Sequence, residues 1–402
     1  MNSTTRGPLD GIKVLDLTIW IQGPTAAMCL AALGADVIKV ERAGGGDFSR
    51  NFGGMNGVMF RREGMANLMW VMFNRSKRAL TLDLHEPSAA PVFRKLVEEA
   101  DIFVTNLHPS ALRQFQATSE DLRAINPRLI YARAAGLGEE GPRAEDPCQD
   151  TVGMAYSGFM WTAASSTDRP HYLPGSMADV LSGTMLSFGI MAALRERDRT
   201  GLGQEVSSSQ LQSLLWMQSM MAGAAANFGE EMVPSDPMRP QMPLVNMYEC
   251  GDGRWIALGL ILESHWPPFT EALGIEELRD DVRFAEVGDR IRNSEALTAV
   301  IRERLLHRPA ADWLERLRAS GLWVSPVNRM RDLPDDPQVV ANEYLVRMDD
   351  GWSVPALPFS LHGHRVSTRP APDYGADTDA ILGELGLSEE EVTQLRVDGA
   401  VW

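Results

Sequence analysis

Residues 12–41 read IKVLDLTIWIQGPTAAMCLAALGADVIKVE. Two short apolar runs, at 12–18 and 36–41, flank an Ala-rich stretch at 25–34. The runs are typical of buried strands, and the stretch between them predicts a helix that ends at Gly34. Together they predict one βαβ unit, in which the two strands are parallel.

The same alternation of strand and helix patterns continues along the chain. Strands are predicted at 78–84, 101–105, 128–134 and 204–209, and helices at 87–100, 177–195 and 210–228. Alternation of this kind predicts an α/β fold with a mostly parallel, doubly wound sheet.

A polar, Pro-rich stretch at 230–243, EEMVPSDPMRPQMP, is typical of a linker. A hairpin pattern at 246–260 and helix patterns at 264–273 and 294–306 follow it, which indicates a smaller α+β domain. The predicted segments are the N-terminal part of a large domain at 1–228, a small domain at 229–333, and a return to the large domain at 334–402.

The chain has 402 residues and a formal net charge of −16. Neutralising phosphates requires a clustered excess of Lys and Arg, so this charge argues against a general nucleic-acid binder. The N-terminus has no apolar region behind a basic start, and no later run of about 18 residues is free of polar groups. We therefore expect a cytoplasmic protein that does not bind a membrane.

The cysteines, Cys29, Cys148 and Cys250, are odd in number and far apart. They suggest neither a disulfide framework nor a CxxC metal site. His362 and His364, with one residue between them, are more typical of a surface pair than of metal ligands. We expect no bound metal.

The turn after the first predicted strand contains Gln22, Gly23 and Pro24, where a helix begins with free N–H groups that suit an anion. It lacks the GxGxxG pattern of dinucleotide-binding turns. Basic side chains lie near further predicted strand ends, at Arg42, Arg75, Lys77, Arg78 and Arg113. Because ligands bind at the carboxyl ends of strands in an open α/β sheet, these side chains are candidates to converge on phosphates.

Asp179 lies near the start of a helix that is otherwise apolar and rich in small residues, GSMADVLSGTMLSFGIMAAL. The apolar residues that share one face of this helix are Met177, Leu181, Met185, Phe188 and Ala192. An acid in the first turn either interacts favourably with the helix dipole or serves as a carboxylate nucleophile, flanked by small residues that admit an acyl group. The residues alone leave both interpretations open.

The sequence resembles the family III CoA-transferases, which include formyl-CoA, carnitine-CoA and benzylsuccinate-CoA transferases. Matching segments run in family order over most of the chain: PLDGIKVLDLT, LGADVIKVER, GGGDFSR, NRSKRALTLDL, ADIFVTNLHPSAL, NPRLIYARAAG, ADVLSGTMLSFGIMAALRERDRTGLGQEV and DGRWIALG. The resemblance implies a Rossmann-like large domain, a smaller domain and a dimer of interlocked rings. We expect a homodimer, and a heteromer stays open.

The resemblance also implies a chemistry. In the family, the acid that matches Asp179 attacks a CoA thioester, forms a mixed anhydride and then an aspartyl-CoA thioester, from which CoA passes to a second acid. The implied substrates are an acyl-CoA, of the succinyl-CoA or acetyl-CoA type, and a carboxylic acid, with no permanently bound cofactor. The candidate CoA-binding residues are Gln22, Gly23, Arg42, Met72, Arg75, Lys77, Arg78, Asn106 and Arg113.

Bulky apolar residues are candidates for the acyl pocket. Trp20 and Tyr156 come first, followed by Met55, Met59, Trp70, Met154, Phe159, Met160 and Trp161. Residues of this kind in the pocket would suit a bulky or aromatic acid, such as a benzylsuccinate-type compound, although core packing explains any single one equally well. The GGGGQ loop of formyl-CoA transferases is absent from the sequence, so formyl and oxalate substrates are not expected.

Other functions remain open. An α-methylacyl-CoA racemase needs a His beside an acid, but here Cys148 and Gln149 precede Asp150. A catalytically silent subunit of a heteromeric transferase is disfavoured by the presence of Asp179. A dinucleotide-dependent oxidoreductase is disfavoured by the missing phosphate-binding fingerprint.

Overall fold

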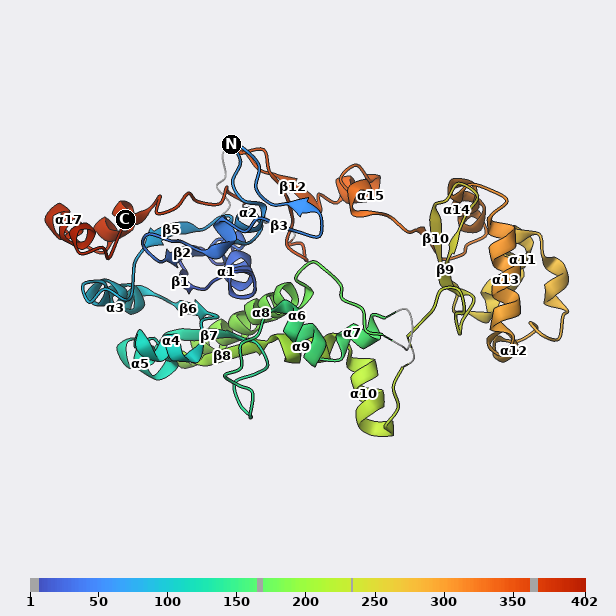
Figure 1. Cartoon of the computed structure of the whole chain (residues 1–402), viewed down its shortest axis with the longest axis horizontal. Coiled ribbons are helices and arrows are strands. Elements are labelled where there is room, and N and C mark those ends of the chain that lie inside the picture. The colour runs from blue at the N-terminus through green and yellow to red at the C-terminus, as the bar shows by residue number, and fades with distance from the viewer. Residues whose placement is uncertain (1–6, 165–168, 233, 362–367) are drawn as a thin grey trace. The chain divides into compact units, whose positions relative to one another are not determined.

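The structure is a computed structural model that describes residues 7–164, 169–232, 234–361 and 368–402 (Figure 1). The chain divides into two compact units. Unit 1 contains Met1–Phe159, Tyr172–Glu230 and Glu343–Trp402, and unit 2 contains Met160–His171 and Glu231–Asn342. The boundaries that we placed at residues 229 and 333 from the sequence remain a prediction.

Unit 1 is built on a six-stranded sheet in which all neighbouring strands are parallel. In order across the sheet, the strands are β5 (Arg78–Thr81), β2 (Asp36–Glu41), β1 (Lys13–Leu17), β6 (Ile102–Thr105), β7 (Ile130–Ala135) and β8 (Glu205–Ser209). The α/β fold and the parallel sheet predicted from the sequence are confirmed.

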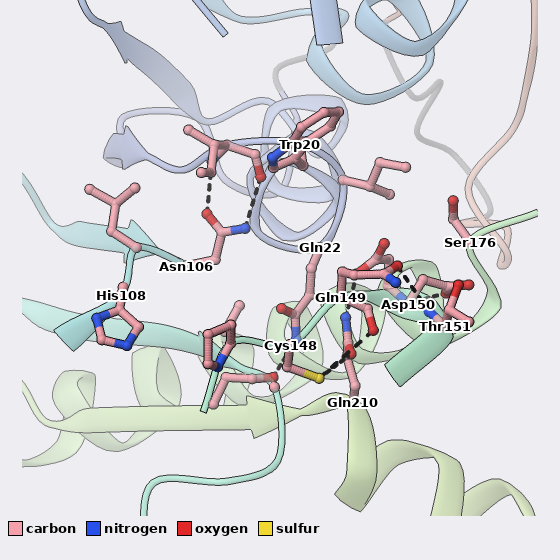
Figure 2. Close-up of a pocket in the computed structure, with 18 of the residues that line it drawn as sticks. Trp20, Gln22, Asn106, His108, Cys148, Gln149, Asp150, Thr151, Ser176 and Gln210 are labelled. Atoms are coloured by element: carbon pink, nitrogen blue, oxygen red, sulfur yellow. Dashed lines mark hydrogen bonds between the residues drawn. The ribbon is translucent and has the colours of Figure 1, made fainter. Parts of the chain in front are cut away.

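The direction of winding reverses between β1 and β6, because β1 connects to β2 on one side and β6 connects to β7 on the other. A crevice forms outside the carboxyl ends of strands at such a point. Asn106, directly after β6, bridges it: its Oδ1 accepts from the Ile19 N–H and its Nδ2 donates to the Ile19 carbonyl, both at 2.8 Å (Figure 2).

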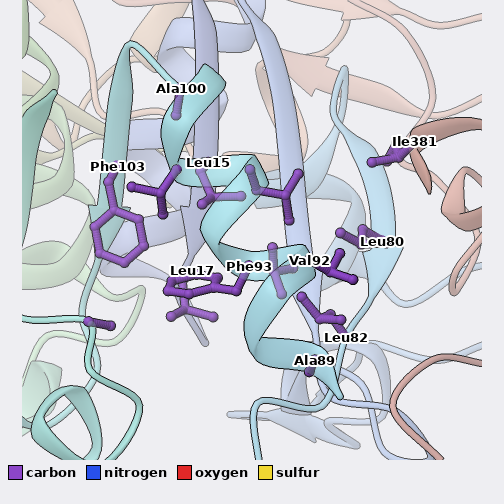
Figure 3. Close-up of a cluster of buried hydrophobic side chains, with 14 of the residues drawn as sticks. Leu15, Leu17, Leu80, Leu82, Ala89, Val92, Phe93, Ala100, Phe103 and Ile381 are labelled. Carbon is purple, nitrogen blue, oxygen red and sulfur yellow. The ribbon is translucent and has the colours of Figure 1, made fainter. Parts of the chain in front are cut away.

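One face of the sheet is covered by α3 (Ala89–Glu99) and by helices from the end of the chain. Leu80 of β5, Phe93 of α3 and Ile381 of α16 (Thr378–Glu384) belong to the same buried cluster (Figure 3). The C-terminal segment is therefore an integral part of the core of unit 1.

The opposite face is covered by α1 (Gln22–Ala32) and α8 (Met177–Thr200). Val14 packs in this second core, whereas its neighbour Leu15 packs in the first. Successive side chains of a strand point to opposite faces, so β1 contributes to both cores.

α8 is confirmed as a helix, but the face that it buries is not its apolar stripe. Its buried residues are Ala178, Ser182, Gly183, Leu186, Ile190, Ala193, Leu194 and Arg197. A side chain at Gly183 would lie 2.3 Å from the Gln22 carbonyl oxygen, so glycine permits the close approach of α8 to α1. In the stripe singled out from the sequence, Phe188 is 73% exposed.

Within the described residues, α8 is also the one helix long and apolar enough to cross a membrane, and one such helix is weak evidence for a membrane span.

The helix predicted at 210–228 is two helices, α9 (Gln210–Met217) and α10 (Ser219–Phe228). The helix breaks at Gln218, whose buried side-chain amide donates to the Leu214 carbonyl at 3.1 Å. A side-chain amide that competes for backbone acceptors in this way was not visible in the apolar pattern.

Unit 2 has a three-stranded antiparallel sheet of β9 (Val245–Glu249), β10 (Trp255–Gly259) and β11 (Val324–Pro326). The β9–β10 pair confirms the predicted hairpin. The helices of its core are α11 (Trp266–Leu273), α13 (Ser294–Leu305) and α14 (Ala310–Ala319).

Candidate active site

A cavity of about 540 Å³ in unit 1 lies beside the crevice between β1 and β6. Residues on its wall include Trp20, Gln22, Asn106, His108, Cys148, Gln149, Asp150, Thr151, Ser176, Asp179 and Gln210. Figure 2 shows that they come from several segments far apart in sequence. Of the candidates from the sequence, the cavity therefore brings together Trp20, Gln22, Met55, Asn106 and Asp179.

The first turn of α1 forms part of the wall. Gln22 is buried, and its Nε2 donates to the Ala135 carbonyl at 2.8 Å, which ties α1 to the end of β7. A side chain at Gly23 would lie 2.5 Å from Thr18 Cγ2 and 3.2 Å from Asn106 Cγ, so glycine is required where α1 meets the strand ends. Gln22 thus shapes the cavity through its side-chain amide, and Gly23 does so through its lack of a side chain.

Asp179 stands in the first turn of α8, where Asp150 holds the helix start. Asp150 Oδ1 accepts from the N–H groups of Ala178 (2.8 Å) and Asp179 (3.2 Å). The residue before the helix, Ser176, has φ 58° and provides no side-chain cap. The acid that satisfies the helix N-terminus is therefore Asp150, which leaves the Asp179 carboxylate available for other contacts.

The Asp179 carboxylate is held by the first residue of α9. Gln210 Nε2 donates to Asp179 Oδ1 at 2.6 Å, and the Cys148 thiol donates to Gln210 Oε1 at 3.1 Å. Gln210 is 1% exposed. A side chain at Gly153 of α6 (Asp150–Tyr156) would lie 2.5 Å from Gln210 Oε1, so a glycine makes room for this amide.

The electrostatic surroundings raise the pKa of Asp179 to about 7. Burial is the largest cause, and repulsion from the Asp150 carboxylate adds to it, whereas the hydrogen bond from Gln210 lowers the pKa in part. Burial also raises the pKa of Asp150. The ionised Asp179 carboxylate is thus more basic than that of an ordinary aspartate.

A second cavity of about 600 Å³, also in unit 1, lies outside the ends of β1, β2 and β5. Arg42 lines it, and its largely exposed guanidinium is 3.1 Å from Asp83. Trp20 lines both cavities and stacks on Phe48, with ring centroids 5.2 Å apart. Trp20 adopts a left-handed backbone conformation, with φ 65°.

The structure does not bring Arg75, Lys77 and Arg78 to either cavity. The Lys77 ammonium is fully buried, 2.7 Å from Asp16. Arg75 is buried and donates to backbone carbonyls, including that of Met72. Arg75 and Lys77 precede β5, and Arg78 is its first residue, so the structure places them away from the carboxyl end of β5, where we expected them to lie.

Other candidates lie at the periphery. Arg78, at the start of β5, pairs with Asp36 and Glu384, at 3.1 and 2.6 Å. Arg113 is exposed and pairs with Glu145 at 3.0 Å. Met72 is half-buried and packs against a small apolar cluster with Val71, Met348 and Val354. None of these described side chains lines either cavity.

Most of the bulky residues proposed for the acyl pocket lie elsewhere. Tyr156 is 53% exposed and outside both cavities, and Met154 is buried in the core. Trp70 is buried beneath the Arg50 guanidinium, which lies 3.5 Å from the ring centroid. Of the apolar candidates, Trp20 and Met55 line the first cavity, whose wall beside Asp179 is polar.

The side chains that contact Asp179 most closely were not identified as functional from the sequence. From the sequence, Asp150 was weighed only against the acid of a racemase, and Cys148 only against racemase, disulfide and metal-site patterns. Nothing in the local pattern around Gln210 indicates a contact with α8. Among the residues that the structure describes, no group of three or more His, Cys, Asp or Glu side chains is arranged to hold a metal ion. His362 and His364 lie outside the described residues.

Comparison with known proteins gives matches over nearly the whole chain. The model of CoA-transferase family III matches residues 9–378. Acetyl-CoA:oxalate CoA-transferase of Acetobacter aceti is 32% identical, over 89% of this chain and 90% of its own. The succinyl-CoA–L-malate CoA-transferase beta subunit of Chloroflexus aurantiacus is 29% identical, over 98% of each. The crystal structure of a CAIB/BAIF family protein from Brucella suis superposes with a TM-score of 0.85 at 29% identity, covering 94% of this chain and 100% of that one.

Proposed function

The chain belongs to CoA-transferase family III, and from this premise we propose that Asp179 carries CoA between an acyl-CoA donor and a carboxylic acid as an aspartyl-CoA thioester. One observation carries the proposal. Asp179 lies on the wall of a cavity at the switch point of the sheet, with one carboxylate oxygen held by Gln210 and its pKa raised to about 7. A carboxylate with that basicity suits attack on a thioester.

The proposed steps exchange bonds without an external oxidant or reductant. An Asp179 oxygen attacks the thioester carbonyl carbon, the C–S bond breaks, and CoA departs as the thiolate. A mixed anhydride of Asp179 and the donor acid remains. The thiolate attacks the Asp179 carbonyl carbon, which releases the donor acid and forms the aspartyl thioester. The acceptor carboxylate attacks that thioester, which releases the thiolate again and forms a second mixed anhydride. The thiolate then attacks the acceptor's acyl carbon in this anhydride, which forms the new acyl-CoA and restores the Asp179 carboxylate.

The enclosed position of Asp179 supports this route, because each intermediate keeps the activation of the original thioester only while water is excluded. The proposal puts the thioester in the first cavity and the nucleotide end of CoA in the second, since Trp20 borders both. Arg42, whose guanidinium is largely exposed in the second cavity, is the proposed phosphate contact. Arg113 stays a weaker candidate at the periphery.

The names of the relatives guide the choice of donor and acid. Acetyl-CoA and succinyl-CoA are the donors named for the two relatives above, and we propose a donor of this type. The cavity has an apolar part, lined by Trp20, Phe52, Met55 and Met69, as well as the polar wall beside Asp179, so the bulky or aromatic acid expected from the sequence stays a proposal. The similarity to an oxalate enzyme removes the reason to set oxalate aside.

We also propose that the chain works as a dimer. Exposed apolar side chains on α8, α9 and α10 support this: Phe188, Trp216, Met220 and Phe228 are each 73–76% exposed. Exposed apolar groups of this size on neighbouring helices mark a surface that another chain covers. A relative named as a beta subunit keeps a heteromer possible, and light scattering of the purified chain distinguishes the two.

The function is tested by trapping the intermediate. The full-length protein is incubated with acetyl-CoA or succinyl-CoA, treated with hydroxylamine or borohydride, and analysed by intact mass and peptide mapping. We expect a modification on the peptide that contains Asp179, and none in Asp179→Asn. An unmodified wild-type protein that nevertheless turns over acyl-CoA and acid would refute the covalent route.

A further inference from the structure

A chain of hydrogen bonds runs from Cys148 through Gln210 to Asp179 along the wall of the first cavity. The Cys148 thiol donates to Gln210 Oε1 at 3.1 Å, and Gln210 Nε2 donates to Asp179 Oδ1 at 2.6 Å. Figure 2 shows the Cys148 sulfur and the Gln210 amide pointing toward each other across the cavity wall. The participants come from the loop after β7, the start of α9 and the first turn of α8.

The direction of this chain depends on which end of the amide faces the carboxylate. An ionised carboxylate only accepts hydrogen bonds, so it requires the NH₂ end of Gln210. With the amide turned by half a rotation, Oε1 would face Asp179 Oδ1, and two acceptors would repel each other. Sulfur accepts hydrogen bonds only weakly, so a thiol that donates to Oε1 favours the amide orientation that suits the ionised form of Asp179.

The Gln210 side chain has little room to adopt another position. It is 1% exposed, and the space above Gly153 is so tight that a side chain there would lie 2.5 Å from Gln210 Oε1 and 2.9 Å from its Cβ. The amide is therefore held in one place, and its only remaining freedom is the exchange of its oxygen and NH₂ ends. Since Gln210 engages Oδ1 of Asp179, Oδ2 is the oxygen that the proposed mechanism uses for attack.

We infer that Gln210 is a positioning residue for the Asp179 nucleophile and that Cys148 acts through Gln210 by selecting the orientation of its amide. The inference rests on the proposed function and deepens it. Neither residue forms a bond to substrate in this scheme. Their effect is to hold one oxygen of Asp179 and to favour its ionised state over its protonated state.

Other charged groups around the site set the background for this effect. Asp150 on α6 faces Asp179 and raises its pKa, whereas Gln210 lowers it. Arg133 of β7, which pairs with Glu139 at 3.1 Å, also lines the cavity, together with Asp146 and His108. Loss of the Gln210 bond leaves these charges unchanged, so the pKa of Asp179 is expected to rise further.

The test uses Gln210→Met, which keeps the length of the side chain and removes the amide. Rates are measured from pH 6 to pH 9 with the substrate pair that gives turnover in the wild type. At pH 7 we expect the rate to fall about 10- to 100-fold, the range for a lost hydrogen bond to a charged group, and part of the loss to recover at pH 9. Gln212→Met, on the exposed side of α9, is the matched control and should behave as the wild type.

The role of Cys148 is tested with two substitutions. Cys148→Ala removes the donor to Gln210 Oε1, and we expect a loss of about 3- to 10-fold, smaller than that of Gln210→Met, because the neutral hydrogen bond is the weaker one. Cys148→Ser supplies a hydroxyl donor in the same place and should recover most of that loss. This pair stands by itself should Gln210→Met fail to fold.

Two results would overturn the inference. One is an equal loss for Gln210→Met at every pH, which a merely structural role would give. The other is a Cys148→Ser variant no more active than Cys148→Ala. Trapping of the wild-type adduct separates the two levels: with an adduct on Asp179 and either of these results, the positioning role fails alone, and without an adduct the proposed function fails.

Discussion

Replacing Asp179 by Asn should make the protein more stable at pH 8 while abolishing CoA transfer. Asn has the same shape, and its Oδ1 still accepts the 2.6 Å hydrogen bond from Gln210 Nε2. The change removes a negative charge that is held in a buried position beside Asp150. The variant thus separates the cost of the charge from the packing of the side chain.

The magnitude follows from the pKa. In the folded protein the pKa of Asp179 is about 7, against an ordinary value of 3.8. Between these values the folded state binds the proton and the unfolded state releases it, so the free energy of unfolding falls as pH rises. Complete ionisation of Asp179 therefore lowers the free energy of unfolding by ~4 kcal/mol, at ~1.4 kcal/mol for each pKa unit between the two values. Because Asp179 keeps some contact with solvent, we expect Asn to gain ~2 to 4 kcal/mol at pH 8.

The assay is urea unfolding of wild type and Asp179→Asn at pH 8 and pH 5. The gain should shrink to less than half at pH 5, where the folded wild type is protonated at Asp179. Asp198→Asn, at an exposed position of α8, serves as the control and should show no comparable pH-dependent difference. The reasoning would be refuted if the stability difference between Asp179→Asn and wild type were the same at both pH values, because folding would then not raise the pKa of Asp179.

Other substitutions test the parts around the proposed nucleophile. Lys77→Met leaves the buried carboxylate of Asp16 without its 2.7 Å partner and should destabilise the protein by ~3 kcal/mol in urea unfolding, since it breaks a buried ion pair. Arg42→Ala should raise KM for the acyl-CoA about tenfold with little change in kcat, measured by steady-state kinetics; an unchanged KM would remove Arg42 from the phosphate site. Asp150→Asn keeps an oxygen to cap α8 but removes the repulsion on Asp179, so the rate should reach its plateau at a lower pH; a shift toward higher pH would contradict this electrostatic picture.

Local sequence patterns were sufficient for the framework. The apolar runs at 12–18 and 36–41 became β1 and β2, and the position of Asp179 in the first turn of a helix was visible directly. Such features depend on neighbours a few residues away, because burial on both faces of a parallel strand produces an uninterrupted apolar run. The chemistry that we propose came from the family resemblance.

Patterns failed where a role depends on contacts between distant segments. Lys77 has the same local character as a surface base, yet β1 places Asp16 beside it and makes it part of the core. The apolar stripe of α8 suggested a buried face at Phe188, but the face that packs on α1 is the one that carries Gly183, because close approach of two helices requires small residues more than apolar ones.

The sequence by itself determined the parallel α/β fold, the family and the candidate nucleophile. Only the tertiary structure decided what surrounds that nucleophile. Asp150 and Gln210 lie 29 and 31 residues from Asp179 in sequence, and they meet it because the strand order brings α6 and α9 against the start of α8. The pKa of a buried carboxylate depends on the charges and donors within a few ångströms of it, and those are set by how the elements pack.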